Sequence, residues 1–168
     1  MNDIENLNWS DIGSNLMDPQ EFKDKIKEKP EKWNNYKEYN PDRMIISRIK
    51  KLLAKHSQKL RILALGATWC KDCSIQLPRM TKISEEFENF EFEFFILYGV
   101  MVDALGHSET KWHREKSPPE ATNPKFDLKA IPTFYIFNKE GNLLDRIIEK
   151  PKKKETLEGE LLFILKNS

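Results

Sequence analysis

The hydrophobic residues of this 168-residue chain recur with two spacings, one typical of helices and one typical of strands. Helical spacing is clearest in residues 41–55, where apolar residues share one face and lysine and arginine side chains take the other. That apolar face consists of Ile45, Ile49, Leu52 and Leu53. The same spacing predicts helices over residues 18–29, over residues 70–87, and from near residue 152 to residue 165.

Segments typical of strands lie between these helices. Residues 61–67 form an apolar run, and residues 90–101 begin with alternating phenylalanine and glutamate and end as a second apolar run. A strand, a helix and a strand in that order predict a parallel crossover. Two later strands, 133–137 and 143–148, are separated by a turn that contains Gly141, which predicts an antiparallel hairpin. We therefore predict an α/β fold with a mixed sheet of about four strands flanked by helices.

The length of the chain suits one main domain. We place this domain at residues 59–168 and predict that a helical N-terminal extension, residues 1–58, packs on it. Three aromatic residues of the extension, Trp33, Tyr36 and Tyr39, stand in a polar stretch. Because aromatic side chains favour burial, we interpret them as anchors to the main domain, with a partner-binding surface as the alternative.

Residues 103–127 form a polar insertion that contains three prolines and is longer than a typical connection between strands. Ser108 is suited to cap a short helix through Lys116, which would carry Trp112 and His113. Two interpretations stay open for the insertion. It is a lid or substrate-contact loop, or it is an ordinary insertion with Trp112 packed onto the main domain.

The composition argues against several classes of protein. Lys and Arg total 28 against 27 Asp and Glu, and the resulting net charge of +1 predicts neither a nucleic-acid partner nor a polybasic membrane anchor. The hydrophobic share of 39% is that of a folded chain. The sequence shows neither a secretory signal nor an apolar run long enough to cross a membrane, so we predict a cytoplasmic protein without membrane association.

The chain has two cysteines, Cys70 and Cys73, at the predicted transition from strand to helix. Unpaired N–H groups and the positive end of the dipole at a helix start lower the pKa of a thiol, which makes Cys70 a nucleophile near neutral pH. Cys73 lies almost one helical turn later, near enough to close a disulfide with Cys70. The spacing therefore predicts that Cys70 attacks and Cys73 resolves.

Zinc sites use the same cysteine spacing but require further ligands. The histidines of the chain are His56, His107 and His113. Because neither a second pair of cysteines nor a compact pair of histidines accompanies Cys70 and Cys73, we predict neither a metal nor an organic cofactor.

Three separated motifs resemble the thioredoxin fold. They are the Trp-Cys-x-x-Cys sequence that begins at Trp69, Pro78 in the following helix, and the Ala-Ile-Pro-Thr-Phe sequence of residues 130–134. The motifs occur in the order expected for that family, and the resemblance covers residues 59–166.

The resemblance implies roles for several residues. In the family, the proline that aligns with Pro132 follows a cis peptide bond and faces the cysteines, and the backbone of Ile131 would pair with an extended substrate. The proline that aligns with Pro78 kinks the helix, and Trp69 would shield the disulfide beside the substrate.

The chain also departs from thioredoxins proper. Ala64 stands where they have a buried aspartate, and residues 149–151 lack the glycine that follows their final hairpin. Lys71 and Asp72 replace their Gly-Pro between the cysteines. Because Lys71 is nearer to Cys70 in sequence, we predict that its charge outweighs that of Asp72 and lowers the pKa of the thiol.

We therefore predict a monomeric thiol–disulfide oxidoreductase that acts on protein or peptide disulfides through a reversible Cys70–Cys73 disulfide, together with an unidentified electron donor or acceptor. Two alternatives stay open: a thioredoxin-fold binding module without redox turnover, and a thiol peroxidase. A peroxidase needs a threonine and an arginine beside its cysteine. Thr68 precedes the motif, and the sequence places no arginine there.

Overall fold

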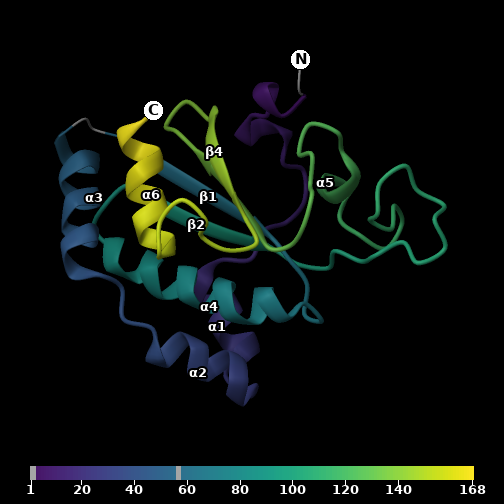
Figure 1. Cartoon of the computed structure of the whole chain (residues 1–168), viewed down its shortest axis with the longest axis horizontal. Helices are drawn as coiled ribbons and strands as arrows, with labels where there is room; N and C mark the ends of the chain where they lie inside the picture. The colour runs from purple at the N-terminus through teal and green to yellow at the C-terminus, as the bar shows by residue number, and fades with distance from the viewer. Residues whose placement is uncertain (1–2, 56–57) are drawn as a thin grey trace.

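The computed structural model describes residues 3–55 and 58–168. Its centre is a mixed four-stranded sheet with the strand order β2-β1-β3-β4 (Figure 1). The strands are β1 (Leu60–Leu65), β2 (Phe92–Leu97), β3 (Thr133–Phe137) and β4 (Leu143–Ile148). β1 pairs in parallel with β2 and antiparallel with β3, which pairs antiparallel with β4. The predicted mixed sheet, parallel crossover and hairpin are confirmed.

The helices of the main body are α3 (Arg43–Lys55), α4 (Lys71–Ser84), which the short turn η3 (Glu85–Phe87) continues, and α6 (Leu157–Lys166) (Figure 1). α4 connects β1 to β2, and α6 packs between α4 and α3. The buried face of α3 holds Ile46 and Ile49, while Ile45 is only partly buried, so this face is rotated slightly from the predicted one. Within the described ranges, no helix has the length and apolar character needed to span a membrane.

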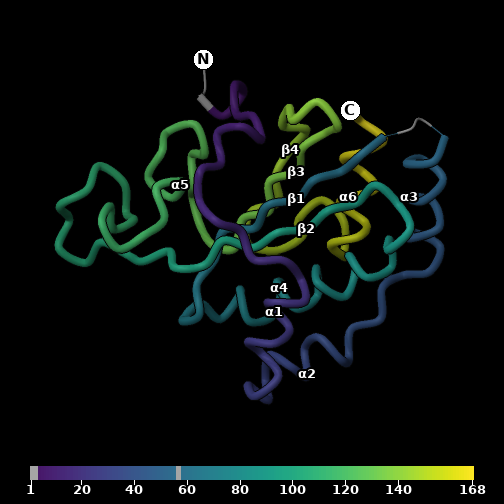
Figure 2. The backbone as a smooth tube through the Cα atoms, turned by 180° about the vertical axis from the view of Figure 1, so that it is seen from behind, coloured from purple at the N-terminus to yellow at the C-terminus, as the bar shows by residue number. Residues whose placement is uncertain are grey.

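The face of the sheet opposite α4 is covered largely by irregular chain rather than by long helices (Figure 2). Trp9, from the segment before α1, packs on Phe95 of β2 with their ring centroids 5.8 Å apart. Phe126, from the segment after the short helix α5 (Pro119–Thr122), packs on Tyr135 of β3 at 5.6 Å. The sheet therefore lies between a helical layer and a layer made by two segments that are distant in sequence.

The N-terminal region contains η1 (Asp3–Asn6), η2 (Trp9–Asp11), α1 (Pro19–Ile26) and α2 (Pro30–Glu38). Met17 forms an isolated antiparallel bridge with Ile96, which covers the outer edge of β2 before the chain enters α1. The Asp18 carboxylate accepts the backbone N–H of Glu21 at 2.8 Å and so caps α1. The helix predicted over residues 18–29 is confirmed, with a shorter C-terminal end.

α2 is a helix that sequence analysis does not predict, because its polar residues hide any apolar period and Tyr36 is its one buried residue. Tyr36 stacks on Trp33 at 5.1 Å, and its hydroxyl donates to Glu85 at 2.5 Å. The hydroxyl of Tyr39 donates to Glu158 of α6. These aromatic residues therefore attach α2 to the main body, as we interpreted them, whereas the domain boundary stays a prediction.

β2 and α6 are also shorter than predicted. β2 ends at Leu97 because the chain turns at Gly99, whose φ of 102° is accessible mainly to glycine. α6 begins at Leu157 rather than near Lys152, since the side chain of Thr156 caps the helix there.

The helix predicted from Ser108 to Lys116 is wrong. Val102 and Trp112 instead form an isolated antiparallel bridge that closes a loop. The carboxylate of Asp103 accepts the backbone N–H of Ser108 at 2.5 Å, so a bond within the loop replaces the expected cap. Trp112 is buried, as the interpretation of an insertion packed onto the main domain expects.

Candidate redox site

The two cysteines lie where β1 gives way to α4. Cys70 is the N-cap residue of α4, and its Sγ accepts the backbone N–H of Cys73 at 3.1 Å. Both thiols are free; 8% of Cys70 is exposed, and Cys73 is completely buried. Cys70 is therefore the thiol that another molecule can reach first.

Hydrogen bonds separate the acidities of the two thiols. Bonds from the Cys73 thiol and from its backbone N–H lower the pKa of Cys70 to about 7, although burial and the charge of Asp72 oppose them. The pKa of Cys73 is raised, because its thiol is bonded to Cys70 and because it is buried. Near neutral pH, Cys70 thus supplies a thiolate while Cys73 keeps its proton.

The loop before β3 reaches the cysteine pair from a distant part of the sequence. The Ile131–Pro132 peptide bond is cis, and both residues are buried. The thiol of Cys70 donates to the carbonyl oxygen of Ile131 at 3.5 Å. The tertiary structure therefore brings the N-cap of α4 into contact with the backbone position where the family resemblance places a substrate.

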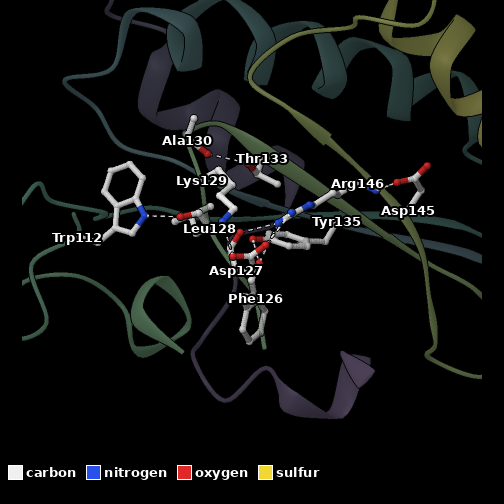
Figure 3. Close-up of polar contacts among 10 residues, drawn as sticks. All are labelled: Trp112, Phe126, Asp127, Leu128, Lys129, Ala130, Thr133, Tyr135, Asp145 and Arg146. Carbon is white, nitrogen blue, oxygen red and sulfur yellow. Dashed lines mark hydrogen bonds and ion pairs between the residues drawn. The ribbon is translucent and has the colours of Figure 1, made fainter. Parts of the chain in front are cut away.

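A side chain from β4 holds the segment that leads into this loop (Figure 3). The guanidinium of Arg146 donates to the carbonyl of Asp127 at 2.6 Å and to its carboxylate at 3.0 Å. The hydroxyl of Tyr135 donates to the carbonyl of Phe126 at 2.7 Å. Asp127 has a φ of 43°, in the left-handed region. Sequence analysis missed Arg146, because no local pattern shows that an arginine of a hairpin strand reaches a distant loop.

Trp69 lies beside the cysteines with 51% of its surface exposed. Its Nε1 donates to the carbonyl of Val100 at 2.9 Å, which ties the indole to the chain that follows β2. Half of the indole surface is therefore available to a partner.

The prediction that the charge of Lys71 outweighs that of Asp72 in its effect on the pKa of Cys70 is wrong. Lys71 is exposed, whereas Asp72 is partly buried. The side-chain charge that acts on the pKa of Cys70 is that of Asp72, which raises it. Solvent screens the charge of an exposed lysine, so proximity in sequence does not decide which charge prevails.

Residues that sequence analysis did not single out lie close to Cys73. A β-carbon at Gly66 would lie 3.2 Å from the Sγ of Cys73 and 3.6 Å from the ring of Tyr98. Burial, followed by the charges of the cysteines, raises the pKa of Tyr98, so its hydroxyl stays protonated near neutral pH.

Ala64, where thioredoxins have an aspartate, is fully buried and offers no side-chain proton acceptor.

An open groove of about 550 Å³ adjoins Cys70. One wall is the start of α2, residues 29–32, and the other is formed by residues 68–71. The Nζ of Lys32 bridges these walls by donating to the carbonyl of Thr68 at 3.3 Å. The groove leaves room for a bound chain next to the reactive thiol.

Within residues 3–55 and 58–168, no group of three or more His, Cys, Asp or Glu side chains is placed to hold a metal such as zinc. The Nδ1 of His113 accepts the backbone N–H groups of Glu115 and Lys116. His107 is exposed, and His56 lies outside the described residues.

Known proteins resemble the chain in sequence and in fold. The family model described as thioredoxin matches residues 17–98. Thioredoxin H5 from Arabidopsis thaliana is 29% identical over 99 residues, 59% of this chain and 67% of that protein. Thioredoxin Y2, chloroplastic, from the same plant is 31% identical over 94 residues, 56% of this chain and 45% of that protein. An HIV epitope scaffold, 17% identical, shares the fold with a TM-score of 0.63 over 91% of this chain and 94% of its own.

Proposed function

Because the chain belongs to the thioredoxin-like family, we propose that it is a thiol–disulfide oxidoreductase that acts on protein or peptide disulfides. One observation carries the proposal: Cys70, whose pKa is lowered to about 7, contacts the carbonyl of Ile131 beside the cis peptide bond. A nucleophile thus lies next to a backbone group suited to align an extended substrate.

In the proposed reaction, the Cys70 thiolate attacks one sulfur of the substrate disulfide. A disulfide forms between Cys70 and the substrate, and the other substrate sulfur leaves as a thiolate and takes up a proton. Cys73 then loses its proton and attacks the sulfur of Cys70, which releases the second substrate thiol. The substrate gains two electrons, and the chain is left with a Cys70–Cys73 disulfide.

The position of Cys70 at the N-cap of α4 supports attack by Cys70 and resolution by Cys73. Cys70 is the more acidic and more accessible thiol, whereas Cys73 is enclosed and adjoins Cys70. Once Cys70 is bonded to a substrate, it no longer carries a thiolate. The interaction with Cys70 that raises the pKa of Cys73 is then lost, and Cys73 releases its proton more readily.

The substrate chain is placed against the backbone of Ile131. In the reduced protein this carbonyl accepts the Cys70 thiol, and it becomes available to a substrate N–H when Cys70 has lost its proton or bonded to the substrate. We assign substrate contacts to Pro132, to the exposed part of Trp69 and to Lys71.

Both cysteines of the chain belong to the reactive pair, so a second turnover requires reduction by another molecule. We propose that the protein works as a monomer in the cytoplasm and that a separate dithiol donor regenerates it. Asp72 tunes this cycle, because its charge favours the protonated form of Cys70.

Reduction of oxidised insulin in the presence of dithiothreitol tests the proposal. We expect the wild-type protein to accelerate the precipitation of insulin chains and Cys70→Ser to abolish the acceleration. With insulin but without dithiothreitol, Cys73→Ser should accumulate a mixed disulfide through Cys70. A chain whose cysteines form no disulfide on oxidation, judged by a gel shift with a thiol alkylator, would be a binding module. Consumption of peroxide without exchange with any disulfide would identify a peroxidase.

A further inference from the structure

The groove beside Cys70 carries an excess of positive charge. Lys29 and Lys32 lie on its α2 wall, and Lys71 lies on the other wall. Glu31 is the one acidic residue among the described residues that line it. Over the whole chain the two signs almost cancel, with 28 Lys and Arg against 27 Asp and Glu. The groove is therefore more positive than the rest of the chain.

The charges of the three lysines are available to a ligand. In the part of the chain that the structure describes, none of the three forms an ion pair with a carboxylate. Lys29 and Lys71 are exposed. The ammonium group of Lys32 donates to the carbonyl oxygen of Thr68, which carries no net charge. An anion that enters the groove can therefore pair with all three.

Hydrogen bonds hold the α2 wall against the helix that begins at Cys70. The side-chain amide of Asn35 donates to the carbonyl of Ser74, a residue that also lines the groove, at 2.9 Å. The hydroxyl of Tyr36 donates to Glu85, just after the end of α4. α2 thus lies beside α4 (Figure 1), and the lysines at its start stay next to the reactive thiol.

Two helices begin at the groove. Lys29 is the N-cap residue of α2, and Cys70 is the N-cap residue of α4, so the positive ends of both helix dipoles border the groove. Glu31, in the first turn of α2, offsets part of this positive potential. The dipoles therefore act in the same direction as the three lysine charges.

The groove is placed to contact residues next to the cysteine of a substrate. Cys70 itself lines it, so a substrate disulfide at the Cys70 sulfur brings the adjoining residues of the substrate to the groove. An extended chain advances roughly 3.3 Å per residue, which keeps the first few residues beside the substrate cysteine close to Cys70. Carboxylates at these positions would be attracted by the lysines, and ammonium groups there would be repelled.

We propose that this groove selects protein and peptide disulfides in which aspartate or glutamate flanks the cysteine, with Lys29 and Lys32 as specificity-determining residues. The inference rests on the proposed exchange activity and names the class of its substrate. Ion pairs at exposed positions are individually weak, so the selection acts mainly on the rate of association and declines as salt is added.

The test measures how fast the full chain reduces two synthetic peptides, each closed by a disulfide. The peptides are identical except that the three residues beside one cysteine are aspartate in the first and asparagine in the second. Second-order rate constants at pH 7 and low ionic strength come from acid quenching and chromatography. The ratio of the two constants is divided by the same ratio for dithiothreitol, which corrects for the intrinsic reactivity of the peptides. We expect a corrected ratio of roughly five for the wild type, falling toward one in 0.5 M NaCl.

Three double variants locate the origin of this ratio. Lys29→Gln/Lys32→Gln should lower the corrected ratio below two. Lys25→Gln/Lys37→Gln is the matched control, because it removes the same charge from exposed lysines of α1 and α2 that do not line the groove, and it should keep the ratio. Lys29→Arg/Lys32→Arg retains the charge and should keep the ratio as well.

The other outcomes separate the selection from the exchange chemistry. A wild-type ratio near one, an equal fall in the two glutamine variants, or an equal fall in the arginine variant would overturn the selection and leave the exchange activity intact. Absence of exchange with both peptides would instead refute the proposed function. The wild-type ratio and its dependence on salt require no variant, and circular dichroism with urea unfolding shows whether each variant keeps the fold.

Discussion

Gly66 and Cys73 lie so close that a β-carbon at position 66 would stand 3.2 Å from the Cys73 sulfur. The same β-carbon would stand 3.1 Å from a methyl group of Leu77, so both neighbours would have to move. Gly66→Ala should therefore displace the resolving thiol and destabilise the protein by about 1–3 kcal/mol, as overpacking does.

This change should slow the second step of exchange more than the first. The measurement is the lifetime of the mixed disulfide after rapid mixing with a chromogenic disulfide, together with urea unfolding. Gly13→Ala is the control, because no atom lies within 4 Å of a β-carbon there. A lifetime equal to that of the wild type would show that Cys73 accommodates the extra methyl group.

The acidity of Cys70 predicts how reactivity depends on pH. Because its pKa is lowered to about 7, the thiolate fraction rises as the pH increases through 7 and levels off above 8. The alkylation rate of the reduced protein should follow this curve, with Cys70 labelled first. Peptide mapping after brief iodoacetamide treatment locates the label. A midpoint near 9, or label on Cys73 before Cys70, would contradict the assignment of the nucleophile.

The correction at Asp72 yields a charge test. Because the Asp72 carboxylate raises the pKa of Cys70, Asp72→Asn should lower that pKa and increase alkylation at pH 6. Lys71→Gln is the comparison at the neighbouring exposed position and should move the pKa less. The ultraviolet absorbance of the thiolate, followed against pH, reports both values. A larger shift from Lys71→Gln than from Asp72→Asn would restore the original prediction.

Arg146 should matter more than an ordinary surface charge. Arg146→Met removes the guanidinium bonds to the carbonyl and the carboxylate of Asp127, and we expect a loss of about 1–3 kcal/mol in the free energy of unfolding. Lys27→Met, which breaks an exposed pair with Asp24, should lower the free energy of unfolding much less, because solvent screens that pair. Exchange activity of Arg146→Met should fall as well, since the segment before Ile131 loses its support, and Arg146→Lys should recover part of it.

The loss in the free energy of unfolding caused by Arg146→Met should also depend on pH. Burial raises the pKa of Asp127, but bonds from Lys129 and Arg146 outweigh it, so the pKa in the folded protein lies below its usual value. The stability from this charge is complete above the unfolded pKa and is lost as the pH falls through the lower folded pKa. Urea unfolding should therefore show a smaller difference between wild type and Arg146→Met at pH 3 than at pH 7. A difference that is independent of pH would mean that only the backbone carbonyls matter.

Local patterns were enough for the number and order of the strands and for the reactive pair of cysteines. The hairpin strands 133–137 and 143–148 have the predicted bounds, because the turn around Gly141 separates two runs rich in apolar and β-branched residues. Cys70 and Cys73 are recognisable because their chemistry depends on a spacing of three residues at a helix start. Local signals were weaker for α2, because its sequence is mostly polar and Tyr36 is its one buried residue. They were misleading for residues 108–116, where the carboxylate of Asp103 accepts the backbone N–H of Ser108.

The sequence by itself determined which residues pair into the sheet and which thiols are available, because hydrophobic period and cysteine spacing act over a few residues. Only the tertiary structure decided the hydrogen bonds of Cys70 with Ile131, of Arg146 with Asp127 and of Trp69 with Val100. Those relationships join residues up to 61 positions apart, and they exist because packing of the sheet against its two layers brings distant backbone groups within hydrogen-bond reach. Burial likewise decided which neighbouring charge acts on the pKa of Cys70. Solvent screens the exposed Lys71 more strongly than the partly buried Asp72.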